Sequence, residues 1–428
     1  MSVRTNNPID KVRELQRALY RAAKRAGGRR FHALYDRITR EDVLWEAFKR
    51  VRANWGAAGV DKESLERIEA EGVEKFLADI RQQLMTRRYR ACPVRRVYIA
   101  KTDGKQRPLG IPTVRERVVQ MATKLVLEPI FEADFIDCSY GFRPRRSAHQ
   151  ALQAILKKIN AGRWWVVDAD IRAFFDSIDH ARLLELVQRR VSDRRVVKLV
   201  RQWLRAGVME EGKVRTTILG TPQGGVISPL MANVYLHELD KIWQQRCKGL
   251  GEVVRYADDL VIVCPSEAAA NESYRRLKLI LEHLGLEVHA EKTRVVDASR
   301  EGFDFLGFHH RAVPSWRSGK ISLQRWPSAK AMKVMRAKVR AVTDRRMTWQ
   351  SLERTVTFLN PILRGWWQYF RWGSSARKAT QLRYYIHQRL ALFDSYKRRH
   401  VGCRWQVHSQ AWFNQLGLCP LTGAGSYT

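Results

Sequence analysis

Two short apolar runs around a pair of aspartates restrict the fold of this chain more than any other segment. Residues 251–264 have the sequence GEVVRYADDLVIVC, in which β-branched residues flank Asp258 and Asp259. Such runs on both sides of a polar turn predict a β-hairpin with two carboxylates at its tip. Adjacent carboxylates repel each other, so a fold that holds them together favours a bound cation. Taken alone, an Asp-Asp turn is more often a solvated loop than a metal site.

An upstream acidic segment supplies a third carboxylate. Residues 164–180 have the sequence WWVVDADIRAFFDSIDH, and the part from Val166 to Ile171 is predicted to be a strand. Asp168 and Asp170 share one face of that strand, and Asp170 stands at its end. One carboxylate here and two on a neighbouring hairpin could hold two Mg²⁺ ions about 3.5–4 Å apart. The metal site is therefore assigned to Asp170, Ile171, Asp258 and Asp259, with the three aspartates as catalytic residues.

A glycine-containing segment lies between these two acidic blocks. Residues 220–236 have the sequence GTPQGGVISPLMANVYL. The Gln-Gly-Gly element predicts a loop whose backbone can approach a ligand closely. Ser228 is expected to be the N-cap of the helix that follows, with Pro229 in its first position. An ordinary glycine turn ahead of a helix is the alternative interpretation.

A basic turn is predicted further upstream. Residues 98–112 have the sequence YIAKTDGKQRPLGIP, which is typical of a strand, a turn and a second strand. Lys101 and Arg107 belong to this turn, and an arginine can grip a phosphate through two parallel hydrogen bonds. The turn therefore suits a triphosphate, although a solvated basic turn is the alternative.

The charge of the chain indicates a polyanionic partner. The sequence has 78 Lys and Arg against 43 Asp and Glu, a formal net charge of +35, which favours nucleic acid or an anionic membrane. No apolar run approaches the length of a spanning helix, and the N-terminus is too polar for a signal peptide. Six scattered cysteines without a CxxC pair predict free thiols. We expect a cytoplasmic protein that associates with the nucleoid through nucleic acid, without a membrane partner.

The positive charge is concentrated toward both ends. The first 90 residues or so are basic and predicted to be helical, whereas residues 311–428 hold 22 Lys and Arg, three acids and eight of the 14 tryptophans. In the latter region, one face of a predicted helix carries methionine and valine side chains that suit a core. Its other face carries three cations that are assigned to RNA binding: Lys333, Arg336 and Arg340. Gly319 and Pro327 suggest a linker before this region.

The ordered set of motifs resembles the group II intron reverse transcriptase/maturase family of bacteria. The matching blocks run from about residue 45 to about residue 420. They are NWGAAGVD (54–61), RPLGIPTVRERVVQ (107–120), YGFRPRRSAHQAL (140–152), VDADIRAFFDSIDH (167–180), TPQGGVISPLMANVYLHELD (221–240), RYADDLVIV (255–263), EKT (291–293), FLGF (305–308) and RGWWQYF (364–370). A single block is weak support, but nine in this order make a specific match.

The resemblance implies a role for each matching position. Asp170, Asp258 and Asp259 would be the catalytic metal ligands, and Phe175 the steric gate that excludes a ribose 2′-hydroxyl. The incoming nucleotide would be bound by Lys101, Arg107, Phe175, Gln223 and Lys292, of which Lys292 would lie near the pyrophosphate. The primer grip would be formed by Phe305, Leu306, Gly307 and Phe308.

The resemblance also implies partners and an architecture. The partners would be group II intron RNA, an RNA template with a DNA primer, dNTPs and a DNA target, with two Mg²⁺ ions per active site and an undefined oligomeric state. The expected fold is an α+β right-hand polymerase with an antiparallel palm sheet. Its expected parts are a basic N-terminal extension (1–90), fingers and palm (91–324), a helical thumb or maturase domain (325–400) and a short basic C-terminal segment (401–428) without an endonuclease domain. The chain would thus be similar to the compact members typified by group IIC introns.

Three functions are compatible with these motifs. The first is an RNA-directed DNA polymerase that binds its intron RNA, assists splicing and copies the intron for retrohoming. The second is a non-catalytic RNA-binding splicing maturase, against which the three carboxylates argue, because a pure binder gains nothing from anions beside RNA. The third is a domesticated reverse transcriptase in DNA repair or CRISPR adaptation, which the flanking genome would distinguish.

Overall fold

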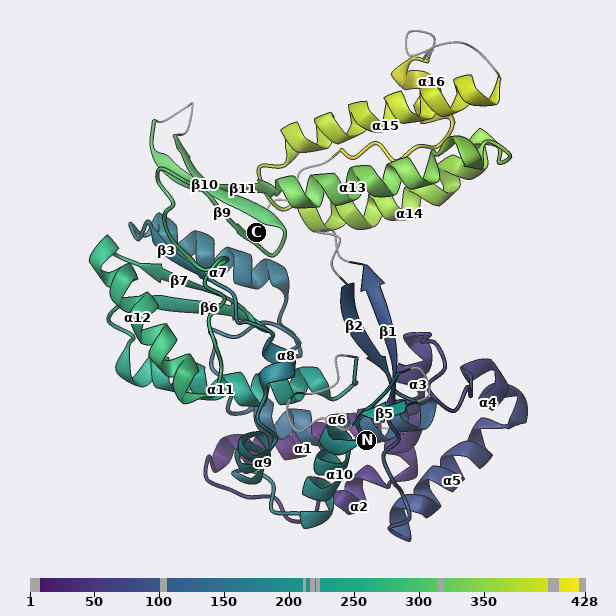
Figure 1. The fold of residues 1–428 in the computed structure, drawn as a ribbon, viewed down its shortest axis with the longest axis vertical. Coiled ribbons are helices and arrows are strands. Elements are labelled where there is room, and N and C mark those ends of the chain that lie inside the picture. Colours follow the sequence, from purple (N-terminus) through teal and green to yellow (C-terminus); the bar gives the residue numbers. More distant parts are fainter. Residues whose placement is uncertain are drawn as a thin grey trace, which may run out of the picture. The chain divides into compact units, whose positions relative to one another are not determined.

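The structure is a computed structural model, and the chain in it divides into two compact units that alternate along the sequence. Unit 1 comprises Met1–Ser147, Ala169–Leu260 and Glu272–Thr293, and unit 2 comprises Ala148–Asp168, Val261–Asn271 and Arg294–Thr428. The residues described are 8–100, 106–210, 213–215, 220, 224–314, 319–398 and 408–422. Figure 1 shows the elements with their labels.

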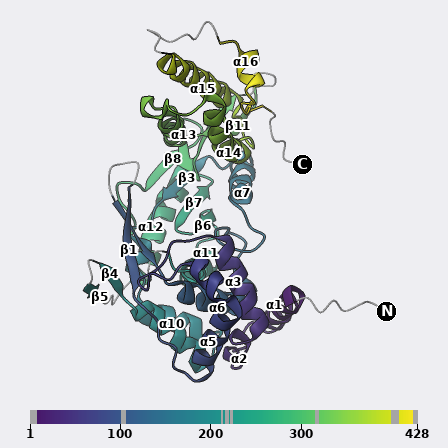
Figure 2. The same cartoon turned by 90° about the vertical axis from the view of Figure 1, so that its right-hand side faces the viewer.

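Unit 1 is built around a buried helix. Its helices are α1 (Pro8–Arg25), α2 (Tyr35–Ile38), α3 (Glu41–Ala53), α4 (Leu65–Glu71), α5 (Val73–Met85), α6 (Val114–Glu132), α8 (Phe174–Ser177), α9 (His180–Gln188), α10 (Arg194–Arg205) and α11 (Ser228–Arg246). Most side chains of α6 are buried, and this helix packs against α1, α2, α3 and α11. Thr113 caps α6 by accepting a hydrogen bond from Glu116 N. Figure 2 shows α1, α3 and α6 close together.

A four-stranded sheet with the order β2-β1-β4-β5 also belongs to unit 1. Its strands are β1 (Val94–Ala100), β2 (Gln106–Ile111), β4 (Val208–Glu210) and β5 (Lys213–Arg215). β1 and β2 pair antiparallel, with Tyr98 opposite Pro108. This pairing confirms the two predicted strands, whereas the turn predicted between them, residues 101–105, lies outside the described residues.

A second four-stranded sheet carries the acidic motifs and has the order β6-β7-β3-β8. Its strands are β3 (Trp165–Ala169), β6 (Glu252–Tyr256), β7 (Asp259–Cys264) and β8 (Arg294–Asp297). β3 and β8 pair antiparallel, with Val166 opposite Val296. The run from Leu260 to Cys264 is buried throughout, as expected for a central strand covered on both faces. The two strands β6 and β7 confirm the predicted hairpin, and α12 (Glu267–His283) follows it.

Unit 2 combines a sheet with a group of helices. A three-stranded sheet with the order β11-β10-β9 is formed by β9 (Phe303–Phe305), β10 (Phe308–Pro314) and β11 (Ile321–Pro327). The helices are α7 (Ala148–Asn160), α13 (Ala329–Val342), α14 (Leu352–Phe370), α15 (Ala376–Lys397) and α16 (Gln410–Gln415), with a 3₁₀ turn at Arg345–Met347. Met335, Leu359 and Leu390 are buried in the core that α13, α14 and α15 share, and Figure 1 shows these helices side by side.

Three local expectations are corrected by the structure. The linker predicted at Gly319–Pro327 is wrong, because Ile321–Pro327 is strand β11 and pairs with β10 along seven residues. Ser228 is the first residue of α11 rather than its N-cap, and Ile227 occupies the cap position. Strand β3 ends at Ala169, so Asp170 follows the strand and Ile171 forms only an isolated bridge with Val288.

Three global expectations can be compared with the described residues. No helix in the described ranges has the length and apolarity needed to cross a bilayer. The five cysteines that the structure describes are free thiols. The mixture of helices and mainly antiparallel sheets agrees with the predicted α+β class.

Candidate active site

Asp170 lies at the end of β3 and is held by the segment that precedes β8. Its backbone N donates to Thr293 Oγ1 at 3.3 Å, and its carbonyl oxygen accepts from His289 N at 2.8 Å. Its Oδ2 accepts from Lys292 Nζ at 2.6 Å, while the carboxyl side chain retains 27% exposure. Asp170 is therefore fixed through its backbone, and its carboxylate is partly accessible and has a cation beside it.

Asp258 lies in the turn between β6 and β7, and Asp259 follows it directly. Asp258 is half-buried, Asp259 is exposed and opens β7, and both belong to unit 1 together with Asp170. Ala257 has a φ of +58°, a left-handed conformation that is unfavourable for any residue with a Cβ. Because β7 and β3 are neighbours in the sheet, the aspartates lie at ends of adjacent strands.

These carboxylates have the donor chemistry that Mg²⁺ requires, since all their ligand atoms are oxygens and each side chain is accessible at least in part. In the described residues, no three His, Cys, Asp or Glu side chains stand in a metal-binding arrangement. Instead, the Lys292 ammonium is the cation beside Asp170. Ile171 is 3% exposed and has no side-chain donor, so only its carbonyl oxygen could serve a metal.

Phe175, the expected steric gate, projects from the single-turn helix α8. It is half-buried, and its ring meets the buried ring of Phe174 edge-on, with the ring centroids 5.3 Å apart. Ala173 starts the turn with a φ of +44°. Gly220 packs so closely that an added Cβ would lie 2.9 Å from Phe175 O, and the Gly220 carbonyl accepts from the His180 ring at 2.5 Å. The Phe175 backbone thus packs closely against Gly220, which precedes the Gln-Gly-Gly segment.

The structure describes only part of the expected nucleotide site. Lys101 and Gln223 lie outside the described residues. Arg107 belongs to β2 and pairs with Ile99, but its side chain is not described. Lys292 is described, and its ammonium is paired with Asp170.

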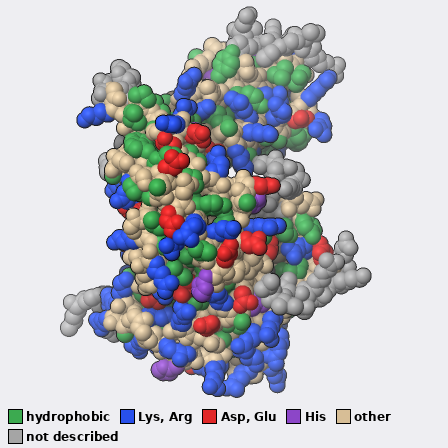
Figure 3. All heavy atoms as spheres, turned by 60° about the vertical axis from the view of Figure 1, so that its left-hand side comes forward, with side chains coloured by type: hydrophobic (Ala, Val, Ile, Leu, Met, Phe, Trp, Pro, Cys, Tyr) green, Lys and Arg blue, Asp and Glu red, His purple; other side chains and the backbone are tan. Residues whose placement is uncertain are grey.

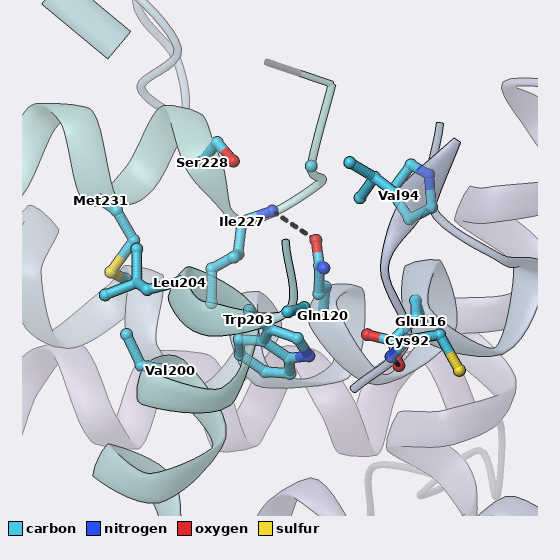
Figure 4. Close-up of a pocket in the computed structure, with 13 residues that line it drawn as sticks. Cys92, Val94, Glu116, Gln120, Val200, Trp203, Leu204, Ile227, Ser228 and Met231 are labelled. Carbon is cyan, nitrogen blue, oxygen red and sulfur yellow. Dashed lines mark hydrogen bonds between the residues drawn. The ribbon is translucent and has the colours of Figure 1, made fainter. Parts of the chain in front are cut away.

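A small cavity lies behind the segment that leads into α11 (Figure 4). Its volume of about 20 Å³ has room for about one water molecule, so it is too small for a nucleotide. Gln120 Oε1 accepts a hydrogen bond from Ile227 N at 3.4 Å across it. Burial raises the pKa of Glu116, which lines the cavity beside Cys92, to about 7. The residues around this cavity support the segment that leads from the Gln-Gly-Gly element into α11, and the cavity is not a substrate site.

The expected primer grip is a tight hairpin between β9 and β10. Phe305 and Phe308 form the pair that closes it, and both are buried. Leu306 and Gly307 have φ of +48° and +78°, as in a type I′ turn. Tyr369 donates its hydroxyl hydrogen to Leu306 O at 2.9 Å. The two phenylalanines are therefore core residues, and only the turn itself is accessible.

The expected RNA-binding cations lie on α13. Met332, Met335 and Val339 are buried, which confirms the predicted core face. The three cations on the opposite face are exposed: Lys333, Arg336 and Arg340. Lys and Arg side chains are widespread on the face drawn in Figure 3.

The side chains beneath the aspartate turn are functional candidates that no sequence motif indicated. Arg255, which precedes Tyr256 in β6, is fully buried and paired with Asp240 of α11. A sequence signal was available, because an arginine inside the apolar run EVVRYADD must find a buried partner. The partner itself could not be named from spacing, since it lies 15 residues earlier in a different element.

Comparisons with known proteins match two families to separate parts of the chain. A family model described as reverse transcriptase (RNA-dependent DNA polymerase) matches residues 99–310, and one described as the maturase-specific domain of group II introns matches residues 332–412. Protein YkfC of Escherichia coli (strain K12) is 35% identical over 342 residues, which cover 71% of this chain and 88% of YkfC. The group II intron-encoded protein LtrA of Lactococcus lactis subsp. cremoris is 41% identical over 214 residues, which cover 49% of this chain and 35% of LtrA.

Proposed function

Because the chain belongs to the group II intron reverse transcriptase/maturase family, we propose that it is an RNA-directed DNA polymerase. Its catalytic metal ligands are Asp170, Asp258 and Asp259. The observation that carries the proposal is the placement of these residues at ends of the adjacent strands β3 and β7, within one compact unit. A non-catalytic maturase has no use for accessible anions in that position.

The three carboxylates would hold the two Mg²⁺ ions, which supply activation of a primer 3′-hydroxyl and neutralisation of the leaving pyrophosphate. Lys292 keeps Asp170 in a charge-compensated state before the metal binds, because its ammonium is 2.6 Å from the carboxylate. With Asp170 serving as a metal ligand, the Lys292 ammonium would be available to bind the leaving pyrophosphate. Thr293 and His289 hold the Asp170 backbone throughout.

The other residues of the chain would select and orient the substrates. Phe175 excludes a ribose 2′-hydroxyl, and Lys101, Arg107 and Gln223 bind the incoming dNTP. At the hairpin from Phe305 to Phe308, the accessible Leu306-Gly307 turn contacts the primer, since both phenylalanine rings are buried.

Intron RNA would bind the exposed cationic face of α13, where Lys333, Arg336 and Arg340 can neutralise phosphates. Binding of this kind weakens with rising salt, because each neutralised phosphate releases counterions. This interaction serves both roles of the protein, which are assistance to splicing and copying of the intron for retrohoming into a DNA target.

Primer extension on an RNA template with a DNA primer, dNTPs and Mg²⁺ tests the proposal. Wild-type protein is expected to make cDNA, and the double substitution Asp258→Ala with Asp259→Ala is expected to abolish it while intron RNA binding persists. Phe175→Val is expected to admit ribonucleotides. Wild-type protein that promotes splicing but makes no cDNA would support the non-catalytic alternative, and cDNA synthesis by the double variant would refute the assignment of the ligands.

A further inference from the structure

A buried ion pair lies directly beneath the aspartate turn. Arg255 of β6 and Asp240 of α11 both have fully buried side chains. Arg255 Nε donates to Asp240 Oδ1 at 2.9 Å, and Nη2 donates to Asp240 Oδ2 at 2.5 Å. Removing two charges from water costs free energy that the attraction between them often only offsets. Stability alone is therefore a weak reason for a charged pair at this position.

The remaining guanidinium nitrogen of Arg255, Nη1, is directed at the turn itself. Nη1 donates to the Ala257 carbonyl at 2.9 Å and to Asn233 Oδ1 at 3.2 Å. The carbonyl belongs to the residue with a φ of +58°, so the guanidinium stabilises a conformation that the backbone otherwise disfavours. Burial alone would lower the pKa of Arg255, but Asp240, with a smaller contribution from Asp258, raises it above its ordinary value. The arginine thus stays charged and lies close enough to Asp258 to interact with it.

The other side of the turn rests on the Cys138–Gly141 segment. Asn233 Nδ2 donates to Gly141 O at 2.8 Å. A Cβ on Gly141 would lie 2.4 Å from Ala257 N, a distance that would require the backbone to move. Arg255 N donates to Cys138 O and Tyr140 N donates to Arg255 O, both at 2.8 Å. The turn is therefore enclosed between a backbone segment and a hydrogen-bonded side-chain network.

We propose that Arg255, Asp240, Asn233 and Gly141 are positioning residues that hold the Ala257-Asp258 turn in its metal-binding conformation. They thereby set the affinity of the active site for divalent cations. A two-carboxylate tip repels itself and cannot be held by apolar packing alone, whereas a fixed guanidinium below it removes part of its conformational freedom before the metal arrives. This inference rests on the proposed function, and it concerns residues outside the set of metal ligands.

The test uses conservative variants and a readout that does not depend on catalysis. Arg255→Lys keeps the charge but loses the fork that reaches Asp240, Asn233 and Ala257 together. Asn233→Ala removes both hydrogen bonds of the amide and leaves the ion pair intact. The matched control is Arg190→Lys, because Arg190 is also buried and paired, to Asp134 at 3.2 Å, and donates to Ala23 O at 3.0 Å.

Mn²⁺ binding is measured without nucleic acid from the electron paramagnetic resonance signal of the free ion, and the Mg²⁺ concentration for half-maximal primer extension is measured in parallel. Arg255→Lys and Asn233→Ala are expected to raise the Mn²⁺ Kd and the half-maximal Mg²⁺ concentration about five- to tenfold, with much of kcat recovered at saturating Mg²⁺. Arg190→Lys is expected to leave both unchanged. Circular dichroism establishes that each variant is folded, and Asn233→Ala keeps the test decisive should Arg255→Lys not fold.

Two results separate this inference from the proposed function. In the first result, Asp258→Asn lowers the Mn²⁺ affinity, but folded Arg255→Lys and Asn233→Ala bind Mn²⁺ as the wild type does, or Arg190→Lys shifts the affinity as much as they do. The positioning role is then overturned, and the assignment of the metal ligands stands. If Asp258→Asn leaves Mn²⁺ binding unchanged and the wild type makes no cDNA, the proposed function itself fails.

Discussion

Two tight hairpin turns in this molecule have opposite kinds of support. Ala257-Asp258 joins β6 to β7, and Leu306-Gly307 joins β9 to β10. Ala257 has a positive φ in the first turn, and both Leu306 and Gly307 have a positive φ in the second. The first rests on the buried Arg255–Asp240 pair. The second rests on aromatic rings, with Phe308 packed 5.5 Å from Tyr369 and 4.8 Å from Phe370 between ring centroids.

The difference in support follows from the charge that each turn carries. A neutral turn such as Leu306-Gly307 can be held by ring packing and by hydrogen bonds from the Tyr369 hydroxyl and from Ser328 N. A turn with adjacent carboxylates gains negative charge that apolar neighbours cannot balance, so a buried cation with several directed donors is the suitable support. We therefore predict that perturbing the first turn changes both stability and metal binding, whereas perturbing the second changes stability and primer binding but leaves metal binding unchanged.

The largest effect is expected from Arg255→Met. The substitution leaves the Asp240 carboxylate buried without its cation, which should lower the free energy of unfolding by about 3–5 kcal/mol. Urea denaturation followed by tryptophan fluorescence measures the loss. The double variant Arg255→Met with Asp240→Leu should recover most of the stability but not the Mn²⁺ affinity. A loss below about 1 kcal/mol in the single variant would contradict the importance assigned to the pair.

The next largest losses of stability are expected when the glycines at the two turns are replaced by alanine. Gly307→Ala should cost about 1–2 kcal/mol, because an alanine there must keep a φ of +78°. Its Cβ would meet the Phe370 ring at an ordinary 3.5 Å, so no further displacement is needed. Gly141→Ala should cost more, since its Cβ would meet Ala257 N at 2.4 Å. Chemical denaturation of both variants tests the order, and the reverse order would show that the aspartate turn yields more easily than we infer.

A smaller effect is expected from Tyr369→Phe. Loss of the hydroxyl removes one hydrogen bond to the Leu306 carbonyl and should lower stability by about 0.5–1.5 kcal/mol. Hydrogen exchange at the amides of 306–308 should accelerate, and the KM for primer should rise. The Mg²⁺ dependence of extension should stay as in the wild type. A shift in Mg²⁺ dependence would break the contrast between the two turns.

The smallest effect at neutral pH concerns His310, in β10 beside the second turn. Burial, with a contribution from the nearby Arg325, lowers the pKa of this imidazole to about 3. The unfolded chain binds the proton first, near its ordinary pKa of about 6.5. The stability due to neutral His310 is therefore complete above pH 6.5 and is lost as pH falls toward 3.

Hydrogen exchange of the β9–β10 amides, corrected for the intrinsic rate, should reveal this loss between pH 6.5 and 5. His310→Phe, which can preserve the stacking on Phe303, should make the protection nearly independent of pH in that interval. Equal pH dependence in the variant and the wild type would assign the effect to other groups. The half-buried His237, with a pKa lowered by desolvation to about 4, is the first of these to test.

Much of the local structure could be predicted from the sequence, because the relevant signals are local. The β-branched runs around Ala257-Asp258-Asp259 form the expected hairpin, and Asp179 caps α9 by accepting a hydrogen bond from Arg182 N at 2.7 Å. The amphipathic pattern of α13 places its methionines in the core. The expectation at Gly319–Pro327 failed because glycine and proline at the ends of β11 resembled a linker, while the pairing with β10 decides the conformation.

The order of the motifs, and the carboxylates that they contain, can be read from the amino-acid sequence alone. The chemistry of a metal site depends on the types of its ligand residues, and the motifs give these types with their positions along the chain. The pairing of Lys292 with Asp170 across 122 residues, and of Arg255 with Asp240 beneath the turn, was decided by tertiary structure. A sequence shows that a buried charge must be compensated, but only the packing of α11 against the β6–β7 turn selects the partner.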